Sequence, residues 1–218
     1  MSEHTVDKES RMYKFVAGKG VLNLPNKLTL ARMIMIPVFV ALFYVQFTGH
    51  YFVALAVFAL ASFTDYLDGH LARKYSLVTN LGKFLDPIAD KVLVASATII
   101  LLTKPEFFTA YLGDWAIIAA GCGVALILAR EMIISGFRMV AADAGIVIAA
   151  DKVGKIKTVC QDACIVMLLV YGGFEEFFDG VAMSTLNYIG LALFALAAIL
   201  TVISGVNYIV KNRQVLKQ

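Results

Sequence analysis

The sequence predicts an all-α, polytopic membrane protein with six transmembrane helices and both termini in the cytoplasm. Two observations support this class. The chain of 218 residues is 60% hydrophobic and only 16% charged, whereas a soluble domain is about 45–50% apolar and about 25% charged. The apolar residues also gather in runs close to the roughly 20 residues that a helix needs to cross a bilayer. This composition excludes a soluble globular protein, a disordered chain and a nucleic-acid-binding module.

Six apolar segments are predicted to be the membrane spans. The first contains Pro37, which membrane helices tolerate as a kink. The segments are residues 28–47, 51–67, 84–102, 115–137, 156–171 and 186–210.

The chain divides into a short N-terminal segment, residues 1–22, and one membrane domain, residues 23–218. The N-terminal segment interleaves basic and apolar side chains. That pattern suits either a short helix at the cytoplasmic membrane surface or an ordinary basic tail. We expect Asn26 or Thr29 to cap the first span.

The basic residues orient the spans. The predicted side that carries both termini holds 18 of the 19 Lys and Arg residues, and only Lys104 lies on the other side, together with five of the 16 acidic residues. The net charges are +7 and −4 respectively. Because basic loops remain cytoplasmic, both termini are expected inside the cell. An N-terminus unlike a transit peptide favours a bacterial inner (plasma) membrane over an organelle.

Four aspartates stand within 26 residues at the cytoplasmic ends of the second and third spans: Asp65, Asp68, Asp86 and Asp90. Spacings of three and four residues place each pair on one helix face. Carboxylates in apolar helices are costly and indicate function. Ligand sets made only of oxygen suit hard cations. The sequence therefore predicts two divalent cations, Mg²⁺ or Mn²⁺, whose charge balances the four carboxylates.

Small and basic residues accompany the aspartates. Gly69, Ala72 and Gly82 leave room for a ligand to approach the backbone closely, and Arg73 offers a fixed positive charge suited to phosphate. Cations and an arginine beside a bilayer indicate a phosphorylated lipid substrate.

Each aspartate pair also has a simpler interpretation. Asp86 precedes Pro87 and is suited to cap a helix that begins there. The first pair is suited to a solvated helix end whose charges are neutralised by Arg73 or Lys74. Both interpretations together do not explain the matched depth of the two pairs.

These residues form a longer pattern that resembles the signature of the CDP-alcohol phosphotransferases. All eight fixed positions match in Asp65-x2-Asp68-Gly69-x2-Ala72-Arg73-x8-Gly82-x3-Asp86-x3-Asp90. The resemblance continues through residues 23–32, 82–91 and 154–158, and through Arg130-Glu131 with Arg138. In these stretches the chain is most similar to the bacterial phosphatidylglycerophosphate synthases.

The resemblance implies a transferase of phospholipid biosynthesis that acts on CDP-diacylglycerol. The hydroxyl of sn-glycerol 3-phosphate would attack the β-phosphorus, and phosphatidylglycerophosphate and CMP would form. It also implies a homodimer in the phospholipid bilayer and no nucleic-acid partner.

The resemblance further implies roles for individual residues. Asp65, Asp68 and Asp86 would bind the metals, and Asp90 would serve as metal ligand and general base. Residues of the signature and of the first span would bind CDP-diacylglycerol: Asp68, Gly69, Ala72, Arg73, Gly82, Thr29 and Arg32.

The phosphate of the acceptor needs basic residues of its own. Candidates at the cytoplasmic ends of the fourth and fifth spans are Arg130, Arg138, Lys155 and Lys157. Glu131 and Arg138 are seven residues apart, hence on one helix face, and we expect an ion pair between them. The competing interpretation of these bases is the general excess of positive charge on the cytoplasmic side.

Three other functions are alternatives to this one. A relative with another acceptor, such as inositol phosphate, serine or phosphatidylglycerol, fits the signature equally well. An ion or proton transporter also uses intramembrane carboxylates, but transporters place them near the midplane and show repeated halves. A membrane scaffold has no need of four convergent aspartates.

Overall fold

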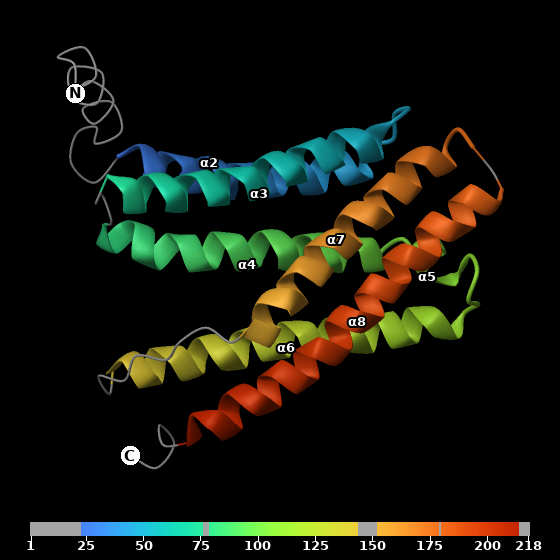
Figure 1. Ribbon diagram of the computed structural model, residues 1–218. Coiled ribbons are helices and arrows are strands. Elements are labelled where there is room, and N and C mark those ends of the chain that lie inside the picture. The colour runs from blue at the N-terminus through green and yellow to red at the C-terminus, as the bar shows by residue number, and fades with distance from the viewer. Residues whose placement is uncertain (1–22, 76–78, 144–151, 179, 214–218) are drawn as a thin grey trace, which may run out of the picture. The chain divides into compact units, whose positions relative to one another are not determined.

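The structure is a computed structural model that describes residues 23–75, 79–143, 152–178 and 180–213 (Figure 1). Within these ranges all regular secondary structure is helical and no strand occurs, which confirms the all-α class. The helices are α2 (Leu24–Tyr44), α3 (His50–Lys74), α4 (Asn80–Leu102), α5 (Glu106–Thr109), α6 (Trp115–Asp143), α7 (Lys152–Glu175) and α8 (Val181–Lys211). The predicted interfacial segment, residues 1–22, lies outside the described residues.

Four of the described helices are long and apolar enough to cross a bilayer: α2, α3, α6 as far as Ala141, and α8. They coincide with the first, second, fourth and sixth predicted spans. The third and fifth predicted spans fall in α4 and α7, which have 23 and 24 residues. These two helices carry charged side chains inside their length, Asp86 and Asp90 in α4 and Lys157 and Asp162 in α7. The chain is therefore a helical membrane protein.

The chain forms two compact units, Met1–Ser96 and Ala97–Gln218. In the first unit α2 and α3 lie side by side along their length (Figure 1). The aromatic rings of Phe39 and Phe58 meet in this interface, with ring centroids 5.7 Å apart, and both side chains are buried. Gly49 turns the chain between the two helices at φ 80°, a conformation that favours glycine.

The start of α2 is held by Asn23. Its side-chain oxygen accepts a hydrogen bond from the backbone N–H of Asn26 at 3.0 Å, and Pro25 occupies the first turn, where no N–H is needed. The predicted caps, Asn26 and Thr29, are therefore wrong. Asn23 is the N-cap because it has the extended backbone that this position requires, whereas Asn26 and Thr29 are already helical.

The start of α4 is anchored to the start of α2. Asn26 Nδ2 donates to Thr79 Oγ1 at 2.8 Å, and the same hydroxyl accepts from the backbone N–H of Gly82 at 3.0 Å. Because α4 begins at Asn80, Asp86 lies inside the helix. The interpretation of Asp86 as a helix cap is thereby excluded.

In the second unit α8 packs along α7 and also against α6. Glycines permit these contacts. A Cβ atom on Gly190 of α8 would lie 2.8 Å from the Leu168 side chain, and a Cβ atom on Gly123 of α6 would lie 2.9 Å from the ring of Phe194. Close approach of backbones is how membrane helices associate, since burial of apolar surface drives little in lipid.

Candidate active site

Three aspartates of the signature are gathered by α2 within the first unit. Arg32 donates from Nη1 to Asp65 Oδ1 at 2.6 Å and from Nη2 to Asp68 Oδ2. The Arg32 side chain is 0% exposed and that of Asp68 is 3% exposed, whereas Asp65 is 42% exposed. One buried guanidinium thus connects two carboxylates that stand one turn apart on α3.

Thr29 connects this pair to α4. Its hydroxyl lies 2.8 Å from Asp86 Oδ1 and 3.3 Å from Asp68 Oδ2, and the residue is 1% exposed. A hydroxyl has one proton, so the shorter contact to Asp86 is the main hydrogen bond. Thr29 and Arg32 lie three residues apart on one face of α2 and together contact three carboxylates from two helices.

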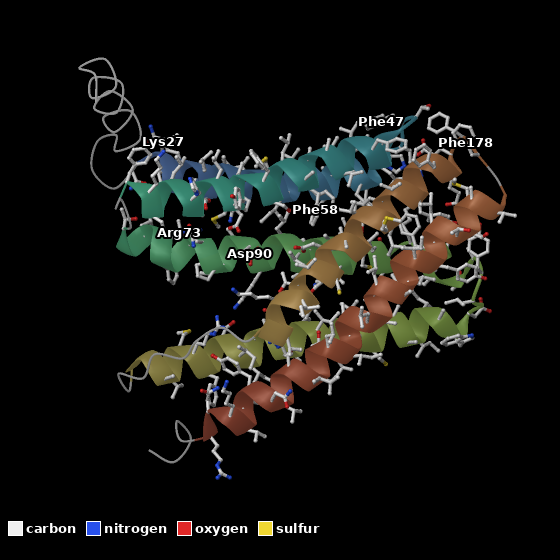
Figure 2. The ribbon with its side chains drawn as sticks, in the orientation of Figure 1. Lys27, Phe47, Phe58, Arg73, Asp90 and Phe178 are labelled. Atoms are coloured by element: carbon white, nitrogen blue, oxygen red, sulfur yellow. The ribbon has the colours of Figure 1, made fainter. Side chains whose placement is uncertain are left out.

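The cationic partner of the first aspartate pair is therefore Arg32, and not the residues that follow the pair. Arg73 is exposed and lies at the same end of the first unit as Lys27, whereas Phe47 lies at the opposite end (Figure 2). Asp90 is exposed on α4 (Figure 2), one helical turn beyond Asp86. Among the described residues, Arg73 forms no ion pair with the three gathered aspartates.

The part of the chain that the structure describes contains no group of three or more acidic, His or Cys side chains close enough to hold one metal ion. The predicted convergence of four aspartates is thus met only in part. The physical reason is visible in the contacts, since one oxygen of each gathered aspartate is turned to α2: Asp65 Oδ1, Asp68 Oδ2 and Asp86 Oδ1.

The donor set nevertheless fits hard divalent cations. The gathered carboxylates carry three negative charges and Arg32 supplies one positive charge, so a charge of −2 remains within largely apolar helices. A second oxygen of each carboxylate accepts no hydrogen bond from the described residues: Asp65 Oδ2, Asp68 Oδ1 and Asp86 Oδ2. Carboxylate oxygens of this kind are the ligands that Mg²⁺ and Mn²⁺ prefer.

The small residues of the signature differ in what they do. A Cβ atom on Gly82 would lie 2.8 Å from Asn26 Oδ1, so this glycine lets α4 approach α2. A Cβ atom on Gly69 would meet only Arg73 Nη2, at an ordinary 3.7 Å. Ala72 and Gly69 are both partly exposed. Packing among the described residues therefore does not require a glycine at position 69.

A separate polar cluster lies in the second unit, where α6, α7 and α8 meet. Lys157 of α7 is 1% exposed, and its Nζ lies 2.7 Å from Glu131 Oε1. Arg130 Nη1 lies 3.2 Å from the same oxygen, and its Nη2 donates to the hydroxyl of Ser204 at 3.1 Å. Two of the four predicted phosphate-binding residues are therefore paired within the chain by one carboxylate.

Arg138 is held differently from what the sequence predicts. It is exposed, and its Nε donates to the hydroxyl of Tyr208 at 3.0 Å. The Tyr208 ring is itself buried against Phe137, with centroids 5.9 Å apart. The predicted ion pair between Glu131 and Arg138 is wrong, because Glu131 is turned to Lys157 and Arg130. Lys155 is exposed.

The comparisons with known proteins cover nearly all of these residues. The family model of the CDP-alcohol phosphatidyltransferases matches residues 22–206. The chain belongs to this family. A relative from Bacillus subtilis is 39% identical over 210 residues, which is 90% of this chain and 98% of the relative. It is named CDP-diacylglycerol–glycerol-3-phosphate 3-phosphatidyltransferase.

Other relatives carry the same name. The protein of Rickettsia typhi is 38% identical over 186 residues, 85% of this chain and 94% of the relative. That of Shigella flexneri is 39% identical over 189 residues, 86% of this chain and 93% of the relative. The family model therefore spans parts of both units, from residue 22 to residue 206.

Some residues of this CDP-alcohol phosphatidyltransferase were missed by the sequence analysis. Ser204 and Tyr208 of α8 contact the predicted arginines, and no motif or charge pattern marks them. Two glycines frame Arg130, since Cβ atoms on Gly154 and Gly205 would lie 3.2 Å from its side chain. In the sequence these residues stand out only as polar or small residues in apolar helices, and that pattern does not predict which side chains they contact.

Proposed function

We propose that this protein transfers the phosphatidyl group of CDP-diacylglycerol to sn-glycerol 3-phosphate, which yields phosphatidylglycerophosphate and CMP. The observation that carries the proposal is the gathering of Asp65, Asp68 and Asp86 around Arg32 and Thr29 at one end of the first unit. The names of the relatives supply the donor and the acceptor.

The three gathered aspartates are proposed to hold two divalent cations, Mg²⁺ or Mn²⁺, together with Asp90. Cations bound there neutralise the diphosphate of the donor and stabilise the leaving CMP. Gly69 and Ala72 leave space on α3 for the diphosphate, and the exposed Arg73 contributes a positive charge at the same end. Gly82 acts indirectly, since it sets the spacing between α4 and α2.

Asp90 is proposed as the general base. It is exposed and stands one turn beyond Asp86 on α4, and the gathered oxygens of the other three aspartates are bound to α2. It accepts the proton of the acceptor hydroxyl as that oxygen bonds to the β-phosphorus. The bond between this phosphorus and the oxygen of CMP breaks, and CMP leaves with the electron pair.

The phosphate of the acceptor is assigned to the basic residues of α6 and α7. Arg138 is the leading residue, because its Nε is held by Tyr208 and its two terminal nitrogens donate to no described residue. Arg130 offers a buried Nε that has no hydrogen-bond partner in the described chain. Lys155 is exposed. Lys157 takes part through its pair with Glu131, since it is almost fully buried.

The proposed setting is a bacterial inner membrane. All six long helices are proposed to span it, with both termini and the carboxylate site on the cytoplasmic side, as the charges of +7 and −4 indicate. A homodimer is proposed from the family resemblance alone.

The first prediction tests the reaction and its acceptor together. The purified full-length protein is given CDP-diacylglycerol and Mg²⁺ with glycerol 3-phosphate, serine or inositol phosphate, and CMP release is measured. We expect release with glycerol 3-phosphate only, and its loss after a chelator removes the cation. Release with one of the other acceptors in its place would contradict the assignment of glycerol 3-phosphate, and release that survives chelation would contradict the metal-dependent mechanism.

A further inference from the structure

Arg32 and Thr29 occupy an unusual position for residues expected to touch a nucleotide. They are 0% and 1% exposed, and the described contacts of the Arg32 guanidinium are with carboxylates of the signature. A ligand as large as a nucleotide would need to displace these contacts to reach the side chains.

The guanidinium is oriented by two carboxylates at once. Nη1 donates to Asp65 and Nη2 donates to Asp68, whereas Nε is buried and has no hydrogen-bond partner among the described residues. The two terminal contacts therefore fix the position of this planar group. They do so even though the unpaired, buried Nε–H is costly. A lysine has a single point charge and cannot reproduce this fork.

The contacts also select between the two oxygens of each aspartate. Arg32 and Thr29 donate to Asp65 Oδ1, Asp68 Oδ2 and Asp86 Oδ1, and the second oxygen of each carboxylate accepts no hydrogen bond from the described residues. A carboxylate held by one oxygen has its other lone pairs pointed in a fixed direction. Residues that orient metal ligands in this way normally change metal affinity 10–100-fold when they are replaced.

We propose that Arg32 and Thr29 are positioning residues for the divalent cations, which act through Asp65, Asp68 and Asp86, and that neither contacts the nucleotide. This inference rests on the proposed function, because it needs cations at these aspartates. It replaces the expectation from the sequence that both residues bind CDP-diacylglycerol. The built-in arginine also holds Asp65 and Asp68 together before any cation arrives, since it offsets part of their mutual repulsion, and Thr29 holds Asp86 beside them.

The decisive variant is Arg32→Lys, which keeps the positive charge and loses the fork. Binding of Mn²⁺ alone to the purified full-length protein is titrated by the electron paramagnetic resonance signal of the free ion. We expect the dissociation constant to rise 10–100-fold. Arg213→Lys is the matched control, because Arg213 is exposed at the end of α8 in the other unit, and it should bind Mn²⁺ as the wild type does.

A second pair of variants guards against a folding defect. Thr29→Val removes the hydroxyl with little change in shape, and Thr29→Ser keeps it. We expect weaker Mn²⁺ binding, by about tenfold, in the valine variant and wild-type binding in the serine variant. A defect of packing alone would affect the smaller serine at least as much as the isosteric valine.

The outcomes separate the inference from the proposed function. Unchanged Mn²⁺ affinity in Arg32→Lys, with or without a raised KM for CDP-diacylglycerol, overturns the inference and leaves the function standing. Equal effects of the two Thr29 variants also overturn it. A wild-type protein that takes up no Mn²⁺ contradicts the metal-dependent function itself.

Discussion

At the scale of single residues, the aspartates of the signature have unequal surroundings although their spacing is regular. Asp68 is almost fully buried and accepts from Arg32, whereas Asp90 is exposed on the next helix. A buried carboxylate that is paired with a buried guanidinium is held in one position. An exposed one is suited to meet an incoming substrate and accept a proton. The different burial of Asp68 and Asp90 supports the different roles proposed for them.

The prediction at this scale concerns Asp90→Asn. An amide of nearly the same shape cannot accept the proton, so kcat is expected to fall by about 10²–10⁴. The KM for CDP-diacylglycerol is expected to rise as well, because the amide is a poorer ligand for the proposed cations. Steady-state CMP release measures both constants. Glu106→Gln is the matched control, because Glu106 is an exposed acidic residue remote from the signature in sequence. A variant that retains full activity would remove the assignment of Asp90 as general base.

At the scale of helices, the aspartates of α3 and α4 are held together by hydrogen-bond donors that α2 supplies. The aspartates come from α3 and α4, and the groups that hold them come from one face of α2. This arrangement needs the N-terminal ends of α2 and α4 to approach closely, and the chain of contacts from Asn26 through Thr79 to Gly82 provides that approach. A glycine at position 82 is thus a structural requirement of the site.

Gly82→Ala tests this requirement. The added Cβ atom would lie 2.8 Å from Asn26 Oδ1, and because Asn26 is buried and bonded to Thr79 its side chain has little freedom to move. We expect a loss of about 1–3 kcal/mol in stability, seen as a lower melting temperature in detergent, and a loss of activity. Gly121→Ala is the control, since its added Cβ would have no described atom within 4 Å beyond its chain neighbours and the backbone of its own helix. Equal melting temperatures for the two variants would show that α2 and α4 tolerate a wider spacing.

At the scale of the whole molecule, charge and hydropathy describe one consistent orientation. Nearly all basic residues fall on the side proposed to be cytoplasmic, and the signature lies in the same segments. Within the first unit, the labelled Lys27 and Arg73 lie at one end and Phe47 at the other (Figure 2). An enzyme that uses a water-soluble acceptor needs its carboxylates near the charged ends of its helices, where the membrane meets water.

The orientation is tested by single cysteines in a background that lacks Cys122, Cys160 and Cys164. The positions are Asp114→Cys, before α6, and Arg213→Cys, after α8, both exposed. In intact spheroplasts a membrane-impermeant maleimide should label the first and reach the second only after permeabilisation. Labelling of both positions in intact spheroplasts would contradict the proposed six-span topology.

Much of this protein is determined by its sequence alone. The helical class and four of the spans follow from composition and from the apolar runs, because these are local properties of the chain. The family, and the substrates named for its relatives, follow from the resemblance of the signature and its flanking residues to a known family. The partners of the charged residues do not. Arg32 and Asp65 are 33 residues apart in the sequence, and Thr29 and Asp86 are 57 residues apart. Only the packing of α2 against its neighbours brings such pairs together. The same reason explains why Glu131 binds Lys157 and not Arg138: one helix face permits a contact, but the side chain that a neighbouring helix presents decides it.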